Sequence, residues 1–354
     1  MQFMLSDAMG TPVWVWTGFL IFVIAVMVFD LGILNRKSHV IGVRESMRLY
    51  AFYVALGLAF GVIVWVWRGS RDAFLYLNGF VIEQSLSMDN IFVIAVILSY
   101  FAIPRAYQHR VLFYGILGVI LLRGVMIFAG AAIVARFEWV LYVFAIFLVA
   151  TGVKMLVGSD DGYDVSTNPV LRFMRRHFRI TDGLRGERFV VREADKSGRA
   201  RLHITPLLVA LCVIEVADVI FAVDSIPAIF AITTDPFIVF TSNIFAVLGL
   251  RALFFALAAL LHRLAYLKYA LSLVLVFIGS KILIADLFGI EHIPPGWSLG
   301  ITLSILGGGA AMSIWKTSRD NRVARRQRIE EARHAGAPLG GASAPTVHRG
   351  DTSA

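Results

Sequence analysis

Long apolar runs recur along the sequence at intervals that suit membrane-spanning helices. Nine runs are long enough to cross a hydrocarbon core of roughly 30 Å. They cover approximately residues 13–34, 50–67, 74–100, 111–134, 139–157, 205–232, 237–261, 267–288 and 297–315. The pattern predicts an all-α, polytopic membrane protein with about nine transmembrane helices.

Composition supports a membrane protein and argues against a soluble enzyme. The chain is 58% hydrophobic and only 16% charged, with a mean hydropathy of +0.76, which is too apolar for an ordinary soluble domain. We find no phosphate-binding Walker loop, no GxGxxG after a strand, no HExxH and no nucleophile elbow. The single cysteine, Cys212, cannot build a disulfide framework. We therefore expect no enzymatic activity.

The distribution of basic residues predicts the orientation in a bacterial plasma (inner) membrane. With nine spans and the N-terminus outside, 26 of the 33 Lys and Arg residues fall in cytoplasmic segments and four fall within spans. Only Arg68, Arg71 and Arg136 lie in segments on the outer side of the membrane. The C-terminus is then cytoplasmic. This topology also explains the net charge of +9 better than nucleic-acid binding does. The expected partner is the lipid bilayer, and the sequence identifies no protein partner.

The spans divide the chain into six parts. These are N-terminal helices (1–72), a first transmembrane repeat (73–157), a cytoplasmic loop (158–204), a second repeat (205–288), a last helix (289–317) and a basic, partly disordered tail (318–354). The loop becomes basic from Arg172 onward, so it is expected to touch anionic lipid headgroups or to bind a partner.

The two repeats share an ordered set of polar landmarks. Each contains an acid, five intervening residues, Asp and a small polar residue, followed by an Arg and a Lys that fall within predicted spans. The pairs are Glu83 and Asp218, Asp89 and Asp224, Asn90 and Ser225, Arg123 and Arg251, and Lys154 and Lys281. The Arg-to-Lys separation is 31 residues in the first copy and 30 in the second. Because each copy holds three spans, the copies should have inverted topology, with a site at the midplane.

Five carboxyl groups lie within two apolar spans. They are Glu83, Asp89, Glu215, Asp218 and Asp224. Each costs about 2.5–3.5 kcal/mol at the centre of a bilayer, so a functional site is the default interpretation. Ion pairs that only lock helices together are the alternative, with Arg123, Lys154, Arg251 and Lys281 as candidate charge partners. Four basic groups leave five carboxyls incompletely paired.

Helix geometry adds a constraint to this cluster. Glu83 and Asp89 are separated by six residues, which places them about 120° apart on a straight helix. We therefore expect the helix to be broken near Asp89, and the second copy to be opened by Pro227, which frees the carbonyl of Val223. Unwound carbonyls could then join the carboxylates as ligands.

The candidate ligands are almost all oxygen donors, which suit Mg²⁺, Ca²⁺ and Mn²⁺. The candidate metal-binding residues are Glu83, Asp89, Asn90, Glu215, Asp218, Asp224 and Ser225. We expect the metal to be the transported substrate, and no permanently bound cofactor and no catalytic residue. Since a bilayer favours the protonated form of a carboxyl group, proton coupling is also expected.

The two motifs together resemble the TerC family of membrane proteins. Residues 83–92 are EQSLSMDNIF and residues 218–227 are DVIFAVDSIP. The resemblance covers about residues 74–288. It implies that Glu83, Asp89, Asn90, Asp218, Asp224 and Ser225 form a divalent-cation site, with Glu215 as a further candidate. Family members are implicated in tellurium resistance, in manganese export and in metal supply to exported proteins.

These observations favour an exporter of a divalent cation, with Mn²⁺ preferred and Ca²⁺ or Mg²⁺ as alternatives. An acidic midplane site is a poor host for the tellurite oxyanion, so any tellurium resistance would be indirect. Two rival hypotheses stay open. One is a non-transporting scaffold that recruits stress-resistance or secretion partners through the loop and tail, and the other is an exporter of a small organic cation.

Overall fold

The computed structural model describes residues 7–29, 43–157, 165–194, 200–257, 267–287 and 294–334, and it is mostly helical (84%). Within that part of the chain, six helical segments are long and apolar enough to cross a membrane. They are α2 (Val43–Arg68), α3 (Ser70–Tyr100), α4 (Arg105–Arg136), α5 (Val140–Val157), α7 (Pro206–Phe230) and the pair α8 (Pro236–Leu248) and α9 (Leu250–Leu257). The polytopic, all-α prediction agrees with this arrangement.

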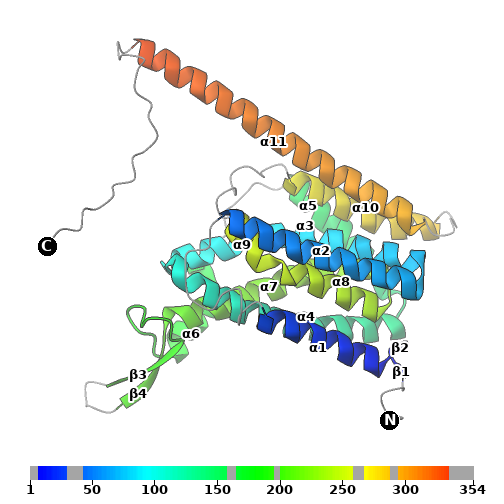
Figure 1. Cartoon of the computed structure of the whole chain (residues 1–354), viewed down its shortest axis with the longest axis horizontal. Coiled ribbons are helices and arrows are strands. Elements are labelled where there is room, and N and C mark those ends of the chain that lie inside the picture. The colour runs from blue at the N-terminus through cyan, green and yellow to red at the C-terminus, as the bar shows by residue number, and fades with distance from the viewer. Residues whose placement is uncertain are drawn as a thin grey trace.

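Three further helices coincide in position with the other expected spans. These are α1 (Val13–Phe29), α10 (Leu267–Leu287) and α11 (Pro295–His334). In Figure 1, α11 runs along one side of the molecule, and its C-terminal part extends past the other helices. It packs against α10 and α3. A 40-residue helix is about 60 Å long, which is roughly twice the thickness of the hydrocarbon core.

Helix α8 occupies the centre of the bundle. Every residue from Phe237 to Leu248 is buried, and α2, α3 and α4 all contact this helix. Such a helix has no side to present to lipid, and its apolar residues accordingly lie on all sides of it. Its start is well defined, because Asp235 caps the helix by accepting hydrogen bonds from the Phe237 and Ile238 backbone N–H groups at 2.9 and 3.1 Å.

Two glycines bring α5 and α10 into backbone contact. A Cβ atom on Gly152 of α5 would lie 2.7 Å from the Ser272 carbonyl oxygen of α10, and one on Gly279 of α10 would lie 2.6 Å from the Ala145 carbonyl oxygen of α5. The two contacts are reciprocal, because each helix contributes one glycine and one carbonyl oxygen. They also show that α5 and α10 are antiparallel, since the residue earlier in α5 (145) contacts the residue later in α10 (279). Only glycine permits this approach at both points.

The segment expected to be a charged linker, residues 158–204, is folded over its described part. It contains a short 3₁₀ turn η3 (Val165–Thr167), helix α6 (Pro169–His177) and the antiparallel strands β3 (Val190–Ala194) and β4 (Ala200–Ile204). Figure 1 shows α6 and this hairpin together at one end of the helices. Leu171 and Met174 anchor α6 in a core that also includes α3 and α7. A second short hairpin, β1 (Asp7–Ala8) with β2 (Thr11–Pro12), precedes α1.

The predicted breaks in α3 and α7 are wrong. Helix α3 continues through residue 89 from Ser70 to Tyr100, and α7 continues through Pro227 to Phe230. Pro227 donates no backbone hydrogen bond to the Val223 carbonyl, yet α7 continues for three more residues to Phe230. The predicted breaks were meant to let the acids approach one another directly. Instead, the long side chain of Arg123 on α4 reaches Glu83 on α3 and Asp218 on α7.

We predict that Gly152→Ala destabilises the protein by about 1–3 kcal/mol, because the added methyl group forces the α5 and α10 backbones apart. Thermal unfolding of the purified protein in detergent would measure the change, and Gly279→Ala should reproduce it. Gly300→Ala on α11 is the matched control, since a Cβ atom there meets nothing within 4 Å. Equal melting temperatures for Gly152→Ala and the control would contradict the close approach.

Candidate functional site: a buried guanidinium between two carboxylates

Arg123 of α4 lies at the centre of a buried polar network. Its side chain is only 1% exposed. The guanidinium donates two hydrogen bonds to the Asp218 carboxylate of α7, from Nε at 3.0 Å and from Nη2 at 2.9 Å. Its Nη1 donates to the carboxylate of Glu83 on α3, which is fully buried. Paired geometry of this kind is typical of the fork-shaped guanidinium.

Three neutral polar groups complete the network. Nη1 of Arg123 also lies 3.5 Å from the Ser225 hydroxyl of α7 and 3.4 Å from the Asn243 amide oxygen of α8. The Asn90 amide of α3 donates to Asp218 at 3.5 Å. Of the seven candidate residues, the structure brings Glu83, Asn90, Asp218 and Ser225 together from α3 and α7.

The network is short of positive charge. Glu83 and Asp218 supply two carboxylates, and among the residues that the structure describes Arg123 is the one cation that forms ion pairs with them. Two buried atoms also remain without a hydrogen-bond partner, Oε2 of Glu83 and Nδ2 of Asn243. Buried polar groups are normally satisfied, so these two atoms keep unused hydrogen-bonding capacity.

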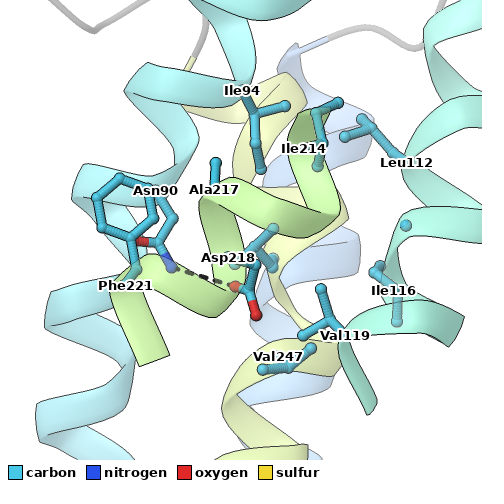
Figure 2. A pocket seen from close by; sticks show the side chains of 12 residues that line it. Asn90, Ile94, Leu112, Ile116, Val119, Ile214, Ala217, Asp218, Phe221 and Val247 are labelled. Carbon is cyan, nitrogen blue, oxygen red and sulfur yellow. Dashed lines mark hydrogen bonds between the residues drawn. The ribbon is translucent and has the colours of Figure 1, made fainter. Parts of the chain in front are cut away.

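A small cavity borders the network on one side. Its free volume of about 20 Å³ is enough for one water-sized occupant. The wall includes Asn90 and Asp218, together with apolar residues of α3, α4, α7, α8 and α9. Figure 2 shows the hydrogen bond between Asn90 and Asp218 at this wall, with the Asp218 carboxylate near Val119 and Val247.

Glu215 lies one turn before Asp218 on α7, and its carboxylate lies against Gly118 of α4. A Cβ atom at position 118 would overlap this carboxylate, so glycine makes room for it. Oε2 of Glu215 is buried and has no hydrogen-bond partner. The Asp218 carboxylate is close enough to Glu215 to act on it electrostatically. A third carboxyl group therefore adjoins the Arg123 network.

Asp224 is held apart from this network. The Thr151 hydroxyl and the Lys154 ammonium group of α5 act on its carboxylate. The 120° separation expected on a straight helix explains why Asp218 and Asp224 meet different neighbours. Asp89, the matching residue of the first repeat, lies on the described helix α3, but its side chain is outside the described residues.

The basic candidates also have different surroundings. Arg251 is as buried as Arg123, yet its Nη1 lies 2.6 Å from Nε2 of His109 on α4. Lys154 is exposed and acts on Asp224, and Lys281 is half-buried on α10. Arg123 is therefore the candidate for which ion pairs with Glu83 and Asp218 are observed.

Within the described part of the chain, no three His, Cys, Asp or Glu side chains already converge on a metal position. Glu83 and Asp218 bind the guanidinium between them instead. The sequence interpretation missed Asn243, because a single amide in an apolar run has no repeat partner and no spacing signal. Its only signal is the presence of a polar side chain in the predicted span 237–261.

The fold and this buried charged network define a polytopic helical membrane protein with an intramembrane polar site. The chain belongs to the integral membrane protein TerC family, whose model matches residues 68–321. The resemblance inferred from residues 83–92 and 218–227 is thereby confirmed, over a longer stretch than expected.

Similar proteins occur in several bacteria. The chain is 46% identical over 310 residues to "Uncharacterized membrane protein STKORF319" of Myxococcus xanthus, covering 88% of this chain and 94% of that protein. It is 43% identical over 325 residues to "Putative membrane-bound redox modulator Alx" of Escherichia coli strain K12, covering 89% and 98%. An "Uncharacterized membrane protein" of Rickettsia felis is 44% identical over 299 residues, covering 84% and 97%. No solved structure matches the chain.

We predict that Arg123→Gln lowers the free energy of unfolding by about 3–5 kcal/mol, because it leaves two buried carboxylates without their cation. Glu83→Gln should cost less than half as much, since the amide oxygen can still accept from Arg123 and Asp218 keeps its paired charge. Chemical unfolding in detergent would measure both. A larger loss for Glu83→Gln than for Arg123→Gln would contradict the proposed charge balance.

Proposed function

We propose that this protein is a secondary transporter that exports a divalent metal cation, with Mn²⁺ as the preferred substrate. The observation that carries the proposal is the excess of buried carboxylate over buried guanidinium beside a cavity. Glu83 and Asp218 share Arg123, and Glu215 adds a third carboxyl group within reach. Excess negative charge inside a membrane protein attracts cations and disfavours oxyanions such as tellurite.

The chemistry and size of the site support an inorganic ion. The available donors are carboxylate, amide and hydroxyl oxygens, which are the ligands that Mn²⁺, Mg²⁺ and Ca²⁺ prefer. A cavity of about 20 Å³ accommodates one water-sized occupant, so it suits a single ion better than an organic cation. Asp89 and Asp224 are proposed as further ligands along the pathway. Proton exchange through the carboxyl groups is proposed as the coupling reaction.

The position of the cavity supports outward transport from the cytoplasm. Its lining residues Leu112 and Ile214 lie about two turns from the first residues of α4 and α7, which are the proposed cytoplasmic ends of those helices. The opposite end is tied by Arg68 of α2, which pairs with Asp72 of α3 at 2.9 Å and with Asp235 before α8 at 2.5 Å. We propose that this conformation faces the cytoplasm.

We also propose nine membrane spans in a bacterial inner membrane, with the N-terminus outside and two inverted three-helix repeats. The reciprocal contacts of Gly152 and Gly279 support the repeat, because a two-fold axis perpendicular to α5 and α10 would relate them. The helix pairs α3 with α8 and α7 with α4 both pack closely, as that axis requires. Alternating access would then move one repeat against the other.

One group of relatives has the word "redox" in its name. That word would favour a redox function for this chain only if the chain could carry out thiol chemistry. A disulfide cycle within one chain needs two thiols, and this chain has Cys212 alone. Metal export could influence the redox state of a cell indirectly. We therefore retain metal transport as the proposed function.

We predict that expression of this protein lowers cellular manganese in a manganese-sensitive bacterial host grown in excess Mn²⁺. Glu83→Gln, Asp89→Asn, Asp218→Asn and Asp224→Asn should each remove at least about 1.4 kcal/mol of ion binding, equivalent to a tenfold loss of affinity, because each removes a charged ligand. Metal content by mass spectrometry at matched membrane expression would measure the effect.

Two control variants separate transport from a scaffold role. Glu187→Gln removes an exposed acid that pairs with Arg110 at 3.2 Å in the folded loop, and it should leave manganese export unchanged. Phe173→Ser changes an exposed residue of α6 in the folded loop. If the protein is a scaffold that works through this loop, Phe173→Ser should abolish its function and the four acid variants should retain it. Unchanged cellular manganese with the wild-type protein would refute the exporter proposal.

A further inference from the structure

We infer that Arg123 is a built-in counter-cation that substrate must displace, and that Glu215 receives the displaced guanidinium. The inference rests on the proposed cation transport and adds a mechanism to the same site. In the empty protein the guanidinium binds the carboxylates of Glu83 and Asp218. In the loaded protein the metal ion takes those carboxylates, and Arg123 pairs with Glu215.

The first argument is that the guanidinium uses the ligands that an ion would need. Arg123 binds both oxygens of Asp218 and one oxygen of Glu83, and its Nη1 also lies near the Ser225 hydroxyl and the Asn243 amide oxygen. A metal ion bound to these oxygens would lie next to the positively charged guanidinium, and the two cations would repel each other. Arg123 and the ion therefore compete for the same carboxylates.

The charge of the metal ion determines whether it binds the two carboxylates more favourably than Arg123 does. Glu83 and Asp218 together require two positive charges, and Arg123 supplies one. A divalent cation supplies both and can also bind Oε2 of Glu83, which is buried and has no hydrogen-bond partner. In a low-dielectric interior a fully neutralised pair of carboxylates is strongly favoured over a half-neutralised one. A monovalent cation would gain no such advantage over the guanidinium, so Arg123 also selects for divalent substrate.

A displaced guanidinium needs a buried acceptor, and Glu215 is positioned to serve as one. Oε2 of Glu215 is buried without a hydrogen-bond partner, which is costly unless another state of the protein satisfies it. Its carboxylate lies against Gly118, which is five residues before Arg123 on α4, or about 7.5 Å along the helix. Because position 118 carries no side chain, the Glu215 carboxylate packs directly on α4, the helix that also carries Arg123.

This switch keeps Arg123 paired in both states. An uncompensated buried guanidinium would cost several kcal/mol, so displacement without an acceptor would make ion binding prohibitively unfavourable. With Glu215 as acceptor, the transfer exchanges one buried ion pair for another. Glu215 is therefore a positioning residue that acts through Arg123, and it need not touch the metal ion.

The test is a double-mutant cycle on Mn²⁺ binding, measured by electron paramagnetic resonance of free Mn²⁺ with the purified full-length protein. Arg123→Gln removes the competitor and should tighten Mn²⁺ binding about tenfold, whereas Glu215→Gln removes the acceptor and should weaken it by a similar factor. In the double variant the Glu215→Gln effect should disappear. Arg136→Gln, an exposed position on the same helix, is the control and should bind like the wild type.

Three results would overturn the inference. Weaker Mn²⁺ binding by Arg123→Gln would show that the guanidinium orients the ligands and does not compete. If Glu215→Gln weakened Mn²⁺ binding equally in the wild type and in Arg123→Gln, Glu215 would be a direct metal ligand. In both cases wild-type binding would leave the proposed function intact, whereas absence of Mn²⁺ binding by the folded wild type would refute both proposals.

Two further measurements apply if Arg123→Gln is poorly folded. Arg123→Lys keeps the charge but loses the forked geometry, so it should also bind Mn²⁺ more tightly than the wild type, and weaker binding would count against competition. In addition, Mn²⁺ should raise the melting temperature of Arg123→Gln more than that of the wild type, because the ion replaces the missing cation. An equal or smaller rise would contradict the inference.

Discussion

Burial of one guanidinium between two carboxylates is the interaction on which the centre of this protein depends. Arg123, Glu83 and Asp218 come from α4, α3 and α7, so their ion pairs fix three helices relative to one another. Inside a bilayer none of these charges can turn to water, and each must find its partner within the protein. The same requirement makes the network responsive to a competing cation, because stability and ligand binding use the same atoms.

The sequence predicted those features that follow from burial in lipid. Apolar run length located the six helical segments of the described chain that are long and apolar enough to cross a membrane, and the cost of membrane-buried charge singled out Glu83 and Asp218 as candidates. It could not predict which buried cation pairs with them, since Arg123 and Arg251 occupy matching positions and only the packing distinguishes their partners. The predicted helix breaks are wrong because Arg123 of α4 is long enough to reach Glu83 on α3 and Asp218 on α7 while both helices stay continuous.

Shorter features were missed for different reasons. The β3–β4 hairpin lies in a segment whose high charge suggested a linker, and charge alone does not exclude strand pairing. Asn243 gave no periodic signal, although its burial in α8 places it beside the guanidinium. Close approach of α5 and α10 depends on Gly152 and Gly279, which in the sequence served only as landmarks of the repeat.

The complete enclosure of α8 has a consequence for how the chain is assembled. Thr241, Ser242 and Asn243 are consecutive polar residues in this helix, and all three are fully buried in the finished protein. Helices α2, α3 and α4 all contact α8 and precede it in the chain, so they are synthesised first. Helix α8 then inserts beside helices that already can contact it, and variants that delay packing of α2 against α3 would leave its polar residues facing lipid.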